Sequence, residues 1–83
     1  ASGGDPLYYA HALTLSVLWD KEYISRFSKG IADALQQAGA GFIGGDLGSS
    51  ASWKYTGICL GSATRPMTRR GARPGDHIYM TGR

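Results

Sequence analysis

A two-residue alternation marks the segment from Leu7 to Trp19. One side of an extended chain would carry Leu13, Leu15 and Val17, and the other side Ala12, Thr14 and Ser16. Such a period of two is typical of a strand, because successive side chains point to opposite faces of a sheet. The pattern therefore predicts a long strand that is buried on its leucine face.

The next segment changes to steps of three and four residues, which predict a helix from Lys21 to Ala38. Its apolar positions are Ile24, Phe27, Ile31, Ala34, Leu35 and Ala38. Asp20 precedes the segment and can cap the first turn, and Gly39 follows the last apolar position, where glycine commonly ends a helix. We expect the apolar face to pack in the core.

Three further strands are predicted after the helix. Gly41 to Ile43 is a short apolar run that leads into a glycine-rich loop over residues 44–50, and Trp53 to Ala63 alternates again. Residues 73–76, Arg-Pro-Gly-Asp, have the composition of a β-turn, and His77 to Thr81 reads as a last strand. The order β-α-β-β-β predicts an α+β fold, with a mixed sheet and the helix packed on one face.

Composition supports one small folded domain. The chain has 83 residues, of which 42% are hydrophobic and 18% charged, too apolar for a disordered segment. Cys59 is the single cysteine, so an internal disulfide is excluded, and its apolar surroundings predict a buried, inert thiol. No apolar run approaches the roughly 20 residues of a membrane span, so we expect a soluble protein with no membrane partner.

The excess of positive charge lies in one segment. The formal net charge is +3, and Arg65, Arg69, Arg70 and Arg73 fall within nine residues. Such a patch attracts anions. It contains no aromatic side chain, whereas single-stranded nucleic-acid sites interleave basic and aromatic residues, so we do not expect a nucleic-acid partner.

Asp46 is the leading candidate for chemistry, because it follows Gly44 and Gly45 at the end of an apolar run. Small neighbours let phosphates approach a backbone, and Mg²⁺ is commonly held by a carboxylate together with phosphate oxygens. The residues alone also fit a simple turn in which Asp46 bonds its own loop. Neither His11 nor His77 has partners at the spacing of a catalytic triad, and no catalytic side chain is predicted.

The whole chain resembles the amino-terminal domain of thiamine-monophosphate kinases, in the superfamily of aminoimidazole ribonucleotide synthetase. The resemblance rests on Gly-Gly-Asp at 44–46 after a strand, on Gly30-Ile31 in the helix, and above all on residues 69–76, Arg-Arg-Gly-Ala-Arg-Pro-Gly-Asp, leading to Thr81-Gly82. It implies that residues 1–83 are part of one ATP- and Mg²⁺-binding domain, with preceding strands and a carboxyl-terminal domain absent.

The resemblance also implies a function. The cytoplasmic kinases of this family phosphorylate thiamine monophosphate to thiamine diphosphate with ATP and Mg²⁺. Their amino-terminal domains form a homodimer in which strands of both subunits close a barrel. Carried over by position, Gly45, Asp46 and Arg70 would contact ATP, and Asp46 would also bind the metal.

Two positions depart from the family pattern. Ser28 stands where a nucleotide-contacting tyrosine is common, and Leu47 stands where a hydroxyl residue usually follows the aspartate. The family's other acidic ligands would precede Ala1, so we expect the 83 residues alone to be inactive. Two alternatives remain: a superfamily member that forms an acyl phosphate intermediate, and a non-catalytic dimerisation module.

Overall fold

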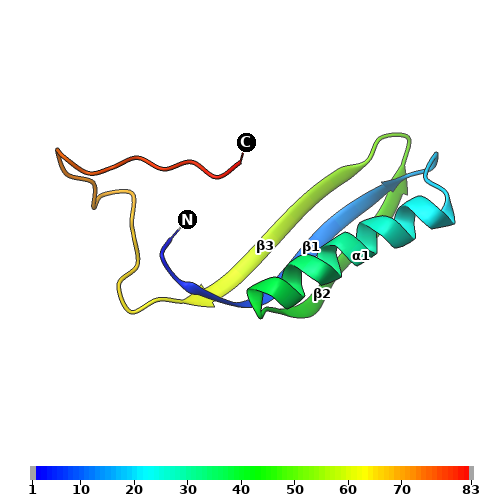
Figure 1. The fold of residues 1–83 in the computed structure, drawn as a ribbon. Helices are drawn as coiled ribbons and strands as arrows, with labels where there is room; N and C mark the ends of the chain where they lie inside the picture. Colours follow the sequence, from blue (N-terminus) through cyan, green and yellow to red (C-terminus); the bar gives the residue numbers. More distant parts are fainter. Residues whose placement is uncertain (1, 83) are drawn as a thin grey trace.

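A computed structural model describes residues 2–82 of the chain. It contains strand β1 (Asp5–Ser16), helix α1 (Lys21–Ala38), strand β2 (Gly41–Ser50) and strand β3 (Lys54–Ser62). The three strands form one mixed sheet in the order β2-β1-β3, in which β2 is parallel and β3 antiparallel to β1. The α+β class is therefore confirmed. Figure 1 shows that α1, which follows β1 in the sequence, runs back along the sheet to the start of β2.

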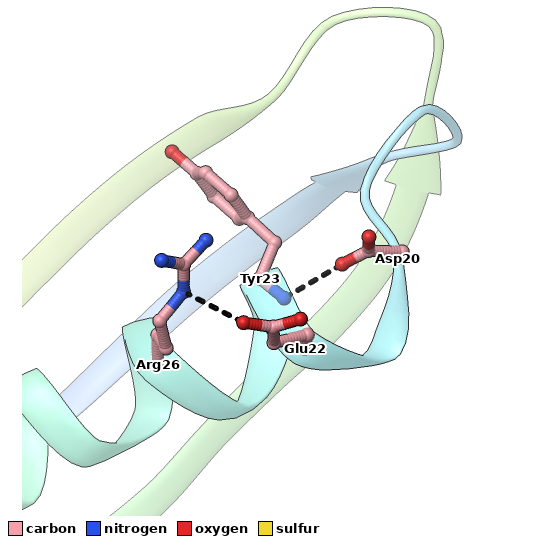
Figure 2. A network of polar contacts seen from close by, with 4 residues as sticks. All are labelled: Asp20, Glu22, Tyr23 and Arg26. Carbon is pink, nitrogen blue, oxygen red and sulfur yellow. Dashed lines mark hydrogen bonds and ion pairs between the residues drawn. The ribbon is translucent and has the colours of Figure 1, made fainter.

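Helix α1 has the predicted bounds because its end signals are local. The side chain of Asp20 accepts a hydrogen bond from the backbone N–H of Tyr23 at 2.8 Å, and Gly39 ends the helix in the left-handed conformation with φ 67°. In Figure 2, Glu22 lies beside this cap and reaches Arg26, one turn further along, at 4.0 Å. That ion pair is exposed, so it contributes little, and the cap is the main local stabiliser.

Replacing Asp20 by alanine should lower the free energy of unfolding by about 1 kcal/mol, since a lost N-cap costs roughly 0.5–2 kcal/mol. Urea unfolding followed by far-ultraviolet circular dichroism measures the change. Asp33→Ala is the matched control, because Asp33 only pairs with Lys29 on the exposed helix surface. An unchanged Asp20→Ala variant would contradict the role of the cap.

One face of the sheet packs against α1, and the core there is small. The side chains of Tyr9 and Leu13 are the buried apolar ones, at 7% and 6% exposure. The helix turns Ile24, Phe27, Ile31 and Leu35 toward the sheet, each half-buried. The predicted helix face is confirmed at these four positions, whereas Ala34 and Ala38 are exposed.

The opposite face of the sheet is uncovered in residues 2–82. Register places Tyr8 beside Leu60 and Ala10 beside Ile58 on this face, which we call the open face. Tyr8, Ile58 and Leu60 are 51%, 54% and 52% exposed. The sheet is therefore covered on one side only.

Several strand predictions need correction. The first strand begins at Asp5 and ends at Ser16, so Val17 lies in a turn and is 68% exposed. The predicted glycine-rich loop over residues 44–50 is part of β2, because its backbone pairs with β1 as far as Ser50. Residues 77–81 form no strand, since no strand of the described chain pairs with them. The element order is thus β-α-β-β.

Candidate nucleotide and metal site

Asp46 lies in the middle of β2, opposite Ala12 of β1. Paired residues on adjacent strands of a pleated sheet point to the same face. Ala12 pairs with Asp46 of β2 and with Thr56 of β3, so register places the side chains of Asp46 and Thr56 on the open face. Asp46 is exposed and takes part in no hydrogen bond or ion pair within residues 2–82. A free carboxylate is thus presented to solvent.

This carboxylate fits one position in the coordination sphere of Mg²⁺. Mg²⁺ is usually bound through one or two carboxylates, several waters and substrate phosphates, so a single protein oxygen is a chemically reasonable share. Residues 2–82 contain no group of three or more histidine, cysteine, aspartate or glutamate side chains that could hold a metal by themselves. The remaining ligands would have to come from phosphates or from other parts of a larger protein.

The two glycines before Asp46 adopt conformations that favour glycine. Gly44 has φ 110° and Gly45 has φ 150°, and Gly45 lies directly against the backbone of His11. In the sequence we explained these glycines by the approach of phosphates. The structure gives Gly45 a packing role in addition, which sequence reasoning missed because the close contact is made with a strand more than thirty residues away.

Arg70 lies in the segment that follows β3, which leaves the sheet and lies away from β2 (Figure 1). It is exposed in a turn in which the N–H of Gly71 donates to the carbonyl of Thr68 at 3.2 Å. The predicted turn over residues 73–76 is confirmed, with an N–H to carbonyl bond from Asp76 to Arg73 at 3.1 Å and φ 96° at Gly75. The described chain does not bring Arg70 into contact with Asp46.

The two positions that depart from the family pattern lie on the helix side of the sheet. Ser28 of α1 and Leu47 of β2 line a groove of about 490 Å³ between the helix and the sheet, and residues 44–46 border the same groove. Leu47 pairs with Leu13, so its side chain faces away from the open face that carries Asp46. The side chains of Leu47 and Asp46 therefore lie on opposite faces of the sheet, although the two residues are adjacent in the sequence.

An aromatic cluster surrounds His11 on the helix side. The rings of Phe42 and Tyr55 lie 5.1 and 5.6 Å from the imidazole, and its Nδ1 is 3.3 Å from the Tyr9 hydroxyl. Within residues 2–82, the side-chain hydrogen-bond partner of His11 is Tyr9. Burial raises the pKa of the Tyr55 hydroxyl, and coulombic repulsion from Cys59 adds to the increase. The cluster is a packing feature.

Cys59 differs from the prediction of a buried thiol. It is exposed on β3, which is an edge strand of the sheet. In residues 2–82, no helix is both long and apolar enough to cross a membrane.

Comparison with known proteins supports the resemblance drawn from the sequence. A family model described as "AIR synthase related protein, N-terminal domain" matches residues 1–63. Among curated proteins, the thiamine-monophosphate kinase of Escherichia coli strain K12 is 37% identical over 83 residues, covering 99% of this chain and 25% of that protein. The kinase of Halobacterium salinarum is 34% identical over 64 residues, covering 77% of this chain and 22% of the other.

Solved structures give the same result for the fold. Thiamine monophosphate kinase from Aquifex aeolicus superposes with a TM-score of 0.79 at 27% identity, over 88% of this chain and 25% of that protein. AaThiL complexed with AMPPCP and TMP gives a TM-score of 0.80 at 27% identity, over 88% and 24%. The chain spans about a quarter of the length of these relatives. On this evidence the chain belongs to the AIR synthase related proteins, within their N-terminal domain.

Proposed function

We propose that residues 1–83 form part of the amino-terminal domain of a thiamine-monophosphate kinase, which uses ATP and Mg²⁺ to convert thiamine monophosphate into thiamine diphosphate. The observation that carries the proposal is the likeness, over 88% of the chain, to a kinase complexed with AMPPCP and TMP. AMPPCP is an analogue of ATP that cannot pass on its γ-phosphoryl group. The described chain contributes an unpaired carboxylate at Asp46 and a basic segment around Arg70.

The proposed roles follow from charge. Asp46 supplies one oxygen ligand to Mg²⁺, which neutralises phosphate charge when bound. Arg70 donates hydrogen bonds to phosphate oxygens of ATP, for which a guanidinium is well suited. A phosphate oxygen of thiamine monophosphate forms a bond to the γ-phosphorus of ATP in line with the bond to the β,γ-bridging oxygen, which breaks so that ADP leaves; this reaction depends on positioning and charge stabilisation. The remaining ligands and the acceptor site belong to the rest of the kinase, so the 83 residues alone are inactive.

The activity is tested on the full-length protein with ATP, Mg²⁺ and thiamine monophosphate, with thiamine diphosphate quantified by ³¹P nuclear magnetic resonance. We expect product to form in proportion to ATP consumed. ATP consumption that requires a different acceptor would point to a superfamily member with an acyl phosphate intermediate. The absence of saturable Mg-ATP binding would point to a non-catalytic dimerisation module.

The Arg70→Ala variant should bind ATP about tenfold or more weakly, because a hydrogen bond to a charged group contributes about 1.5–3 kcal/mol. Isothermal titration calorimetry of the full-length protein with Mg-ATP measures the loss. Arg65→Ala, in the same exposed basic segment, is the control and should bind as the unmodified protein does. Normal ATP affinity in Arg70→Ala would remove this residue from the site.

The open face supports the proposed homodimer, in which strands of both subunits close a barrel. It presents the half-exposed side chains of Tyr8, Ile58 and Leu60 on a sheet that has nothing against it in residues 2–82. Exposed apolar patches of this kind mark interaction sites. A second copy of the same sheet would cover them and would place Asp46 close to the subunit interface.

Introducing a charge on the open face should therefore dissociate the dimer. We expect Ile58→Lys to run as a monomer in sedimentation velocity at micromolar concentration, because a buried unpaired ammonium group is costly. Val17→Lys is the control, since Val17 is more exposed and lies outside the strands. A dimer that survives Ile58→Lys unchanged would exclude this face as the interface.

A further inference from the structure

Strand β2 has one residue more than β1 where the two strands pair. Tyr9 pairs with Phe42 and Ala10 with Gly44, so Ile43 has no partner on β1. This is a β-bulge, a feature that is frequent beside active sites, where it re-aims a side chain. From Gly44 to Ser50 the ladder continues without a further shift.

Two glycines make the bulge possible, for different reasons. Gly44 has φ 110° with open space around the position of a Cβ atom, so only its backbone conformation favours glycine. Gly45 has φ 150°, and a Cβ atom there would overlap the carbonyl oxygen of His11 and lie 2.7 Å from its carbonyl carbon. The close approach of β2 to β1 after the bulge therefore requires the missing side chain of Gly45.

The bulge decides which face carries Asp46. With Ile43 unpaired, Asp46 lies opposite Ala12 on the open face. In an uninterrupted ladder, Ile43 would pair with Ala10 and Asp46 would pair with Leu13. A shift of one residue moves every side chain to the other face. The carboxylate would then point toward α1 and the groove lined by Leu13 and Phe27, where an ionised group is costly.

We propose that Gly45 is a positioning residue, which holds the register after the Ile43 bulge and so keeps the Asp46 carboxylate on the open face. The inference rests on the proposed role of Asp46 in binding Mg-ATP. In this proposal the Gly44-Gly45-Asp46 sequence acts as one unit. The glycines determine that residue 46 lies on the open face, and Asp46 supplies the carboxylate that binds Mg²⁺.

The face of Asp46 is measured first, without nucleotide. In a full-length protein with Cys59→Ser, the pair Ala12→Cys and Asp46→Cys tests whether both positions share a face. Neighbouring strands lie about 4.7–4.9 Å apart, within the Cα separation of a disulfide. We expect rapid disulfide formation on mild oxidation, at least tenfold slower formation when Gly45→Ala is added, and no change with the control Gly48→Ala. Gly48 also lies on β2 and has open space at its Cβ position.

A compensating deletion separates register from general damage. Without Ile43, Phe42 would be followed directly by Gly44, and a regular ladder would keep Asp46 opposite Ala12 with no bulge and no need for glycine at position 45. Deleting Ile43 in the Gly45→Ala background should therefore restore disulfide formation. Unchanged disulfide formation in Gly45→Ala overturns the proposal, and so does a loss that the deletion does not restore.

The same backbone changes are then tested on Mg-ATP binding with Asp46 intact. Gly45→Ala should weaken binding about as much as Asp46→Asn does, and deletion of Ile43 should restore it. If Gly45→Ala abolishes the disulfide but leaves Mg-ATP affinity unchanged, the positioning role holds and the proposed role of Asp46 is wrong. The two failures are thereby distinguished.

Discussion

If the proposed kinase activity holds, Asp46→Ala should abolish Mg²⁺-dependent turnover in the full-length protein, with a loss of at least about a hundredfold and no loss of folding. Stabilisation of transition-state charge by a bound metal ion contributes several kcal/mol, and the variant removes the proposed metal ligand, which register places on the open face. Because the Asp46 side chain is exposed and makes no hydrogen bond or ion pair within residues 2–82, its truncation removes no buried packing. Initial rates over a range of Mg²⁺ concentrations measure the effect.

Two comparisons make this result specific. Asp33→Ala removes a carboxylate from the exposed surface of α1 and should retain activity within about twofold. Asp46→Asn keeps the shape and loses the charge, so it should resemble Asp46→Ala. Turnover that stays normal in Asp46→Ala, with a normal dependence on Mg²⁺, would take Asp46 out of the site.

Leu13→Ala should have the largest effect on stability, a decrease of about 2–5 kcal/mol in the free energy of unfolding. Leu13 is 6% exposed, is one of two buried apolar side chains in residues 2–82, and lies on β1, the strand between the other two. Urea unfolding can be followed by the fluorescence of Trp19 and Trp53, whose rings lie 6.0 Å apart.

The matched control is Leu18→Ala, a leucine that is 87% exposed. Substitution there should change the free energy of unfolding by no more than about 0.5 kcal/mol. Equal effects at the two leucines would mean that the helix side of the sheet is not the core of this domain.

The sequence predicted best what depends on neighbours along the chain. Helix α1 has the predicted bounds because Asp20 and Gly39 act within one turn of its ends. Leu13 and Leu15 face the helix as the alternation indicated, but Val17 does not, because β1 ends at Ser16. The end of a strand is set by its partners, which local patterns do not reveal.

In the candidate site, too, local sequence signals were predictive and strand pairing was not predicted. The Gly-Gly-Asp sequence identified Asp46 as a candidate site residue. Its glycines led us to predict a loop, because glycine is disfavoured inside strands. Only the pairing with β1 shows that residues 44–50 continue β2, and only the unpaired Ile43 shows on which face Asp46 lies. The strand predicted at residues 77–81 failed for a related reason, because an extended segment becomes a strand only beside another one.

The strand order has a consequence for how the protein is made. Of the three described strands, the central strand β1 is synthesised before both of its neighbours, which are complete only when Ser50 and Ser62 have been added. A ribosome that adds about 5–20 residues per second needs several seconds to pass from Ser16 to Ser62. During that time Tyr9 and Leu13 lack the strands that later flank them. Of the three strands, the nascent chain therefore leaves β1 without its partners for longest, and the interval before β3 is made is the one in which β1 is most exposed to aggregation.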